Sequence, residues 1–107
     1  MLRFRTLIAS AAVVLSTAAP ALADEFLRVN NRSGMTIVAL WISNSNLDVW
    51  DAERLRGNRI GNGAAYTARF SNVRSCGYDL RVRYANGSED EFYGINICGG
   101  AEYTIRP

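Results

Sequence analysis

The sequence predicts an all-β protein, a small antiparallel β-sandwich with one short helical turn and one disulfide. Three observations predict this class: several short runs are rich in β-branched and aromatic residues, glycine and asparagine clusters separate them, and no repeat of fixed period is present. Only one segment between these runs has a helical pattern, so a two-layer β architecture is the simplest way to bury the apolar residues.

The N-terminal residues have the pattern of a secretory signal peptide. Arg3 and Arg5 give a basic start, residues 7–19 are apolar, and residues 20–23 read Pro-Ala-Leu-Ala, with the small side chains that a signal peptidase needs. A membrane anchor is the alternative, but the apolar run is shorter than the roughly 20 residues that cross a bilayer. We therefore expect cleavage after Ala23.

Cleavage would divide the chain into a signal peptide, residues 1–23, and a single β domain, residues 24–107, with no membrane anchor. The sequence has 12 basic residues, all arginine, and 10 acidic residues. Because Arg3 and Arg5 belong to the signal peptide, the mature domain would contain 12 − 2 = 10 arginines and 10 acidic residues. A net charge near zero gives no indication of nucleic acid or an anionic membrane as a partner. We expect a periplasmic or secreted protein that does not bind nucleic acid.

Cys76 and Cys98 are the only cysteines, and we predict that they form a disulfide. A lone pair in a short exported domain is usually oxidised, and this pair would close a loop of 98 − 76 = 22 residues, worth about 3 kcal/mol in the chain-entropy model. A redox pair would usually be spaced C-x-x-C, and a zinc site lacks ligands because the sequence has no histidine.

Strand and turn signals alternate along the rest of the chain. The first two runs are expected to pair as a hairpin around the turn at residues 31–34, and the second is apolar enough to be a central strand covered on both faces. We expect strands at residues 25–30, 35–43, 65–70, 77–85, 89–97 and 103–106.

The clearest hairpin joins residues 77–85 and 89–97 through Asn-Gly-Ser. If residues 86–88 form the loop, facing positions sum to 174. Gly94 interrupts the alternation, so a bulge is expected there. The predicted facing pairs are Cys76 with Cys98, Val82 with Phe92, and Arg83 with Glu91.

The segment after the second run contains the candidate binding residues. Asn46 is suited to cap a short helical turn over residues 47–56, with acids early and arginines late. Oxygen-bearing side chains also cluster here, which makes a calcium site an alternative, although the EF-hand spacing is absent. The candidate binding residues are Trp50, Asn44, Asn46, Asp48 and Asp51.

No catalytic constellation is expected, and we predict neither enzymatic activity nor a cofactor or metal. Without histidine, a serine or cysteine protease would lack its usual base. The carboxylates could do acid–base work as pairs, but solvated turn and strand charges beside arginines explain them. Asp79 is expected to pair with a neighbouring arginine, the alternative being a specificity contact. Trp41 and Trp50 are expected in the core, the alternative being a binding surface.

Several segments together resemble a group of small exported proteins of Gram-negative bacteria, whose pattern is V-x-N-x-S/T-G-x-T-I, W, L-x-G, C-x-Y-D-L-R-V, D/N-G and V-N-L-C. The resemblance covers essentially all of the mature chain and implies an exported, disulfide-bonded β domain without implying an activity. Asn86 stands where the group often has Asp, and both suit a turn. The matching residues are 29–37, Trp50, Leu55, Gly57, 76–82, 86–88 and 95–98.

The function expected from these features is an interaction module that binds an unidentified protein or cell-envelope partner through strand edges or loops. Its signature would be an exposed apolar or aromatic patch, or an uncovered edge strand. The alternative is a calcium- or small-ligand-responsive β domain with its site in residues 44–51.

Overall fold

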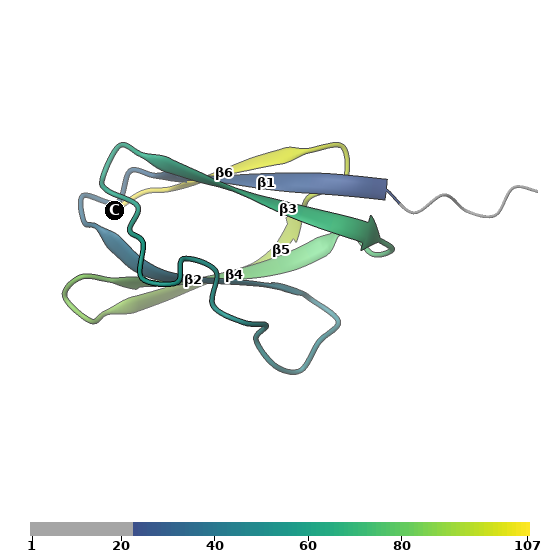
Figure 1. The fold of residues 1–107 in the computed structure, drawn as a ribbon, viewed down its shortest axis with the longest axis horizontal. Coiled ribbons are helices and arrows are strands. Elements are labelled where there is room, and N and C mark those ends of the chain that lie inside the picture. Colours follow the sequence, from purple (N-terminus) through teal and green to yellow (C-terminus); the bar gives the residue numbers. More distant parts are fainter. Residues whose placement is uncertain (1–22) are drawn as a thin grey trace, which may run out of the picture.

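The computed structural model describes residues 23–107, which form two three-stranded sheets packed face to face (Figure 1). The all-β sandwich with one disulfide is therefore confirmed. The predicted signal peptide, apart from its last residue, lies outside the described residues. The strands are β1 (Ala23–Asn31), β2 (Ile37–Asn44), β3 (Ala65–Val73), β4 (Gly77–Tyr84), β5 (Glu89–Asn96) and β6 (Ala101–Ile105).

The strand order is β3-β1-β6 in the first sheet and β2-β4-β5 in the second. β1 pairs antiparallel with β3 and parallel with β6, so the last strand lies beside the first. The predicted hairpin of the first two runs is wrong, because β1 and β2 belong to different sheets. At the end of β1 the main chain is already paired: Asn31 N–H donates to Ala64 O (2.9 Å) and Arg32 N–H to Ile105 O (2.8 Å). β2 is also an edge strand, not the predicted central one.

The core fills the space between the sheets with aliphatic side chains from alternate strand positions. In β4, Leu80, Val82 and Tyr84 point inward and are buried, whereas Arg81 and Arg83 point to the outer face. The side chains of lowest exposure include Leu27, Val29, Ile37, Leu40, Ile42, Leu80, Val82, Ile97 and Ile105.

A buried asparagine holds the chain where it crosses from the first sheet to the second. Asn31 is fully buried, and its Nδ2 donates to Met35 O (2.7 Å) and Ile60 O (2.9 Å). Its Oδ1 accepts from the N–H (3.0 Å) and the Oγ–H (2.7 Å) of Ser33. All the polar atoms of the amide are thus satisfied, as burial in a small core requires.

The β4–β5 hairpin confirms the predicted bulge but not the predicted register. Tyr84 N–H donates to Ser88 O (2.9 Å), and Gly87, with φ 90°, donates to Tyr84 O (2.9 Å). The loop is therefore residues 85–87, because a turn that ends in a left-handed glycine returns Ser88 to the strand. Every facing pair near the turn moves accordingly: Arg81 faces Glu91, Val82 faces Asp90 and Arg83 faces Glu89.

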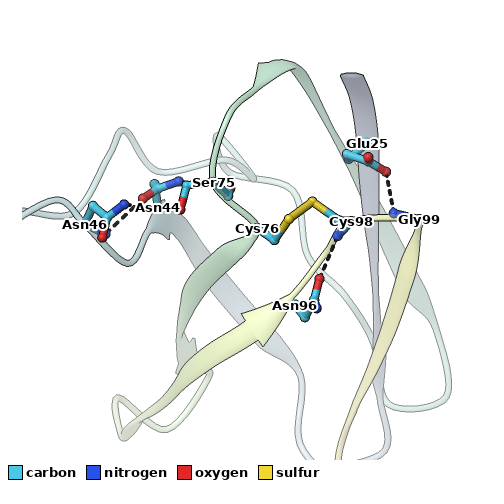
Figure 2. The surroundings of a disulfide bond; sticks show 8 residues. All are labelled: Glu25, Asn44, Asn46, Ser75, Cys76, Asn96, Cys98 and Gly99. Carbon is cyan, nitrogen blue, oxygen red and sulfur yellow. Dashed lines mark hydrogen bonds between the residues drawn. A yellow bond between two sulfur atoms is a disulfide. The ribbon is translucent and has the colours of Figure 1, made fainter. Parts of the chain in front are cut away.

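The disulfide closes the base of this hairpin (Figure 2). The register shifts between Tyr78 and Leu80, where Gly94 has a φ of 69°, and this bulge brings Cys76 and Cys98 together with their Cα atoms 5.3 Å apart. The predicted Cys76–Cys98 bond is thus confirmed. Beside it, Gly99 N–H donates to Glu25 Oε1 (2.9 Å), which links the hairpin base to the first sheet.

We predict that Asn31→Ala lowers the free energy of unfolding by about 3 kcal/mol, because it removes all four hydrogen bonds of this fully buried amide, to Met35 O, Ile60 O and Ser33. Urea denaturation followed by tryptophan fluorescence measures the change. Asn30→Ala is the matched control, since the Asn30 side chain makes only exposed or partly buried contacts. Equal losses in the two variants would contradict the role given to Asn31.

Candidate functional site

The chain between β2 and β3 runs back along the open edge of β2. Ile37 and Ile60 exchange main-chain hydrogen bonds (3.0 and 2.9 Å), and Arg54 N–H donates to Leu40 O (2.8 Å). Asp51 N–H donates to Ser43 Oγ (2.6 Å). The predicted helical turn over residues 47–56 is wrong, since this segment consists of turns and irregular chain. Its main chain is used to cover β2 instead.

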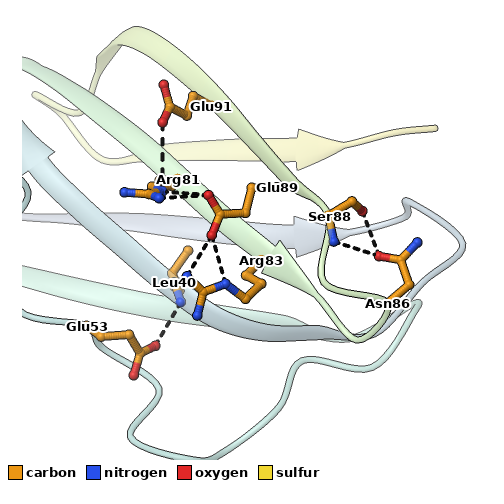
Figure 3. Close-up of polar contacts among 8 residues, drawn as sticks. All are labelled: Leu40, Glu53, Arg81, Arg83, Asn86, Ser88, Glu89 and Glu91. Atoms are coloured by element: carbon orange, nitrogen blue, oxygen red, sulfur yellow. Dashed lines mark hydrogen bonds and ion pairs between the residues drawn. The ribbon is translucent and has the colours of Figure 1, made fainter.

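Glu53 completes this cover with its side chain (Figure 3). Its Oε2 accepts from the N–H groups of Leu40 (2.8 Å) and Leu55 (2.7 Å), and its Oε1 accepts from Arg56 N–H (2.8 Å). Partial burial raises the pKa of the Glu53 carboxyl, and the backbone hydrogen bonds together lower it by more, so the pKa lies below its ordinary value of 4.5. One carboxylate therefore joins β2 to the segment that covers it.

The outer face of the second sheet carries a layer of aromatic and charged side chains. The Arg81 guanidinium lies 5.0 Å from the ring centroid of Trp41 and 6.0 Å from that of Trp50, and the Arg83 guanidinium lies 5.1 Å from Trp41. Both tryptophans are half-buried on this face and lie outside the core, so their predicted core positions are wrong. The arginines cover the rings as cations over π faces.

Glu89 holds the two arginines in place (Figure 3). It lies 2.7 Å from Arg81 and 2.7 Å from Arg83, and Arg81 is also 3.7 Å from Glu91. The hydrogen bonds from Arg81 and Arg83 lower the pKa of Glu89, and the bond to Glu89 raises that of Arg81. This network fixes the positions of both arginines on the outer face of the second sheet.

A shallow cavity of about 190 Å³ lies between residues 47–50 of the segment after β2 and side chains of β4 and β5. Three side chains at its rim are unusually exposed for apolar or aromatic residues: Leu47 (48 %), Val49 (70 %) and Tyr93 (65 %). Tyr93 comes from β5 and the other two from the segment after β2, so the tertiary structure brings them together. The cavity is lined by Ser43, Leu47, Asp48, Val49, Trp50, Asp79, Glu91 and Tyr93.

Of the residues predicted from sequence as a binding site, Trp50 and Asp48 line this cavity and the others do not. Asn44 Oδ1 accepts from Asn46 N–H (2.9 Å), and the two side-chain amides donate to Ser75 O (3.3 Å) and Ser75 Oγ (3.2 Å), so both asparagines hold the turn near the disulfide (Figure 2). Asp51 lines a separate, polar hollow of about 470 Å³.

The oxygens proposed for calcium are therefore not brought together, because Asp48 and Asp51 face different hollows. Within residues 23–107, no group of three or more His, Cys, Asp or Glu side chains is arranged to hold a metal ion.

Asp79 has a different role from the predicted pairing with arginine. Its Oδ1 accepts from Ser45 Oγ (2.7 Å) and from Gly94 N–H (3.0 Å), so it ties the turn after β2 to the bulge in β5. Next to it, Tyr93 donates its hydroxyl to Glu91, and this bond is the main cause of a raised pKa for Tyr93. Leu47, Val49 and Tyr93 were not among the binding residues predicted from the sequence. The sequence did contain one indication of Leu47 and Val49, because both are apolar residues within a polar segment.

The comparisons with known proteins extend only to the fold. No protein-family model and no curated protein matches the sequence. A solved NMR structure of a protein from Eubacterium rectale is similar, with a TM-score of 0.53 and 13 % identity over 78 % of this chain and 77 % of that chain. Identity this low shows a shared fold and nothing further. In the part of the chain that the structure describes, no helix is long and apolar enough to span a bilayer.

We predict that Glu53→Gln lowers the free energy of unfolding by about 1–3 kcal/mol at neutral pH, because an amide nitrogen cannot accept the main-chain N–H groups. The pKa of Glu53 is lowered in the folded state, so the stabilisation is present above pH 4.5 and is lost as the pH falls toward the folded pKa. Urea titrations at several pH values measure both effects.

The matched control is Asp51→Asn, an exposed carboxylate on the same segment. This control should change stability little at neutral pH. If Glu53→Gln were as stable as the wild type at neutral pH, or if their difference did not shrink in acid, the assigned role of the carboxylate would be wrong.

Proposed function

We propose that this protein is an exported interaction module that binds a protein or cell-envelope partner. Its binding surface would be the overhang surface, which we define as the four side chains Leu47, Val49, Trp50 and Tyr93 around the cavity. The exposure of Leu47, Val49 and Tyr93 side by side carries the proposal. Contiguous apolar exposure of this kind is typical of interaction sites on small soluble domains.

The rest of the apolar surface supports this choice of site. Five large hydrophobic side chains are exposed in the described residues, and three of them belong to the overhang surface; Phe26 and Met35 are the other two. Aromatic residues and arginine are also common at the centres of protein interfaces, and Arg81 lies over the ring of Trp50, a member of the overhang surface, and over that of Trp41.

The chemistry of the cavity favours binding over catalysis. Asp79 accepts two hydrogen bonds that hold the fold, and Glu91 accepts from Tyr93, so neither is poised as a catalytic acid or base. A calcium-responsive site has less support, because Asp48 and Asp51 line different hollows and the side chains of Asn44 and Asn46 hydrogen-bond to Ser75.

An oxidising compartment outside the cytoplasm is the proposed location. The Cys76–Cys98 bond is compatible with such a compartment, where disulfides form and persist. The signal-peptide pattern at the N-terminus and the resemblance to exported proteins point to the same location.

We predict that replacing Leu47, Val49 and Tyr93 together by serine abolishes capture of the partner, because the change removes the exposed apolar area without touching the core. The test uses purified protein as bait against a bacterial envelope extract, with bound proteins quantified by mass spectrometry. A protein enriched by the wild type should fall at least about tenfold with the variant.

The matched control is Met35→Ser, which removes an exposed apolar side chain outside the overhang surface. It should retain the enrichment seen with the wild type. Unchanged enrichment with the triple variant, or equal loss with Met35→Ser, would reject the overhang surface as the binding site.

A further inference from the structure

The two edges of the second sheet are treated differently. The edge of β2 is covered by the segment that follows it, whereas β5, among the strands that the structure describes, pairs only with β4. Hydrogen-bonded and non-hydrogen-bonded pairs alternate in an antiparallel ladder, and the bond from Tyr84 to Ser88 fixes their phase. The main-chain groups of Glu89 and Glu91 therefore point away from β4. Within residues 23–107, no main-chain hydrogen bond is made to them from outside the hairpin.

An open edge of this kind can accept another strand. Residues that face each other across a strand pair share the same face of the sheet. A side chain of an added strand that lies opposite Glu91 or Tyr93 would therefore point to the outer face, beside the cavity that these two residues help to line. The open edge and the cavity are thus parts of one surface.

The charge around the cavity is unbalanced. Four carboxylates lie on this face, at Asp48, Asp79, Glu89 and Glu91, and two guanidiniums, Arg81 and Arg83, which leaves 4 − 2 = 2 negative charges in excess. Both arginines make their shortest ion pairs with Glu89. The excess therefore remains with the carboxylates that line the cavity.

The other lining residues suit a long cationic side chain. Trp50 and Tyr93 line the cavity with aromatic rings, which attract cations, and Leu47 and Val49 line it with apolar groups that can contact a methylene stem. Arginine and lysine combine a charged head with such a stem, and a neutral apolar residue would leave the negative charge uncompensated.

We propose that the partner supplies an extended segment that pairs with the open edge of β5 and inserts an arginine or lysine side chain into the cavity. This inference rests on the proposed function and names the chemistry of the partner. The main chain of the segment would bind to the groups of Glu89 and Glu91, and the basic side chain would select the sequence.

Other occupants and other edges fit less well. A second copy of this chain would bring another acidic run, residues 89–91, to the same edge and would repel it. In the first sheet, β6 has only five residues, and neither β3 nor β6 carries an exposed large hydrophobic side chain. Charge and apolar exposure coincide only beside β5 among the described strands.

The test uses the folded domain, labelled with ¹⁵N, and short synthetic peptides of alternating valine and threonine with one central arginine. The matched peptides carry citrulline, which is neutral and of similar shape, in place of arginine, or carry N-methyl groups along the main chain. The arginine peptide should shift the amide signals of Glu89, Glu91 and Tyr93 and the indole signal of Trp50. The other two peptides should bind about tenfold more weakly, and salt should weaken only the cationic peptides.

Protein variants test whether the negative charge at the cavity contributes to binding independently of the stability of the fold. Asp48→Asn should weaken the arginine peptide severalfold and leave the citrulline peptide unchanged, because Asp48 lines the cavity and its side chain makes no hydrogen bond within residues 23–107. Asp51→Asn is the matched control, since Asp51 is an exposed acid of the same segment that lines a different hollow. It should leave both affinities unchanged.

Several outcomes would overturn the proposal. If the arginine and citrulline peptides bound with equal affinity, the proposed role of a cationic side chain would be rejected. If the N-methylated peptide bound as tightly as the unmethylated arginine peptide, the proposed strand pairing would be rejected. The absence of shifts with every peptide would reject both parts. Sedimentation showing a dimer that forms through β5 would assign the edge to a second copy. None of these results would change the envelope pull-down with the triple serine variant, which tests the proposed function separately.

Discussion

The hydrogen bonds that cover the edge of β2 determine how the rest of the second sheet can be used. β2 is a nearly continuous apolar strand at a sheet edge, and an uncovered edge of this composition would be open to association with other chains. The chain that follows returns along it, and the carboxylate of Glu53 accepts the N–H of Leu40 where a neighbouring strand would have supplied a carbonyl. Because this segment is held at the edge, its residues 47–50 overhang the outer face and form one wall of the cavity.

The acidic residues of the domain thus serve its two edges in opposite ways. Glu53 is paired with main-chain donors and keeps the β2 edge closed. Along β5, Glu89 makes short ion pairs with two arginines, whereas the only ion pair of Glu91 among the described residues is the longer contact of 3.7 Å with Arg81. Like charges at an open edge disfavour self-association while leaving main-chain groups available to a partner of opposite charge. The disulfide and the Asn31 hydrogen bonds keep both edges in place, the first at the base of the hairpin and the second where the chain crosses between the sheets.

The candidate site was predictable in part, and the limits have physical reasons. Trp50 and Asp48 were identified because an aromatic residue and an acid in a polar segment are visible in the sequence. Asn44 and Asn46 were predicted as part of a cluster of oxygen-bearing side chains, but both hydrogen-bond to Ser75, which is distant in sequence. Tyr93 could not be associated with Leu47 and Val49, since its place beside them depends on the strand order of the second sheet. A helical turn was expected over residues 47–56 because capping residues and charge order favour one, but main-chain donors there bind to β2 instead.

The sequence by itself determined the all-β class, the approximate bounds of the six strands, the Cys76–Cys98 bond and the bulge at Gly94. These features depend on local preferences: β-branched runs favour strands, glycine permits left-handed backbone, and two cysteines allow one pairing. Only the tertiary structure decided which strands are neighbours, including the parallel pairing of β1 with β6, and which edge is covered. The register of the β4–β5 hairpin was also decided only by the tertiary structure. A shift of the loop by one residue changes every facing pair but leaves the alternation of apolar residues nearly unchanged, so the sequence pattern fits either register.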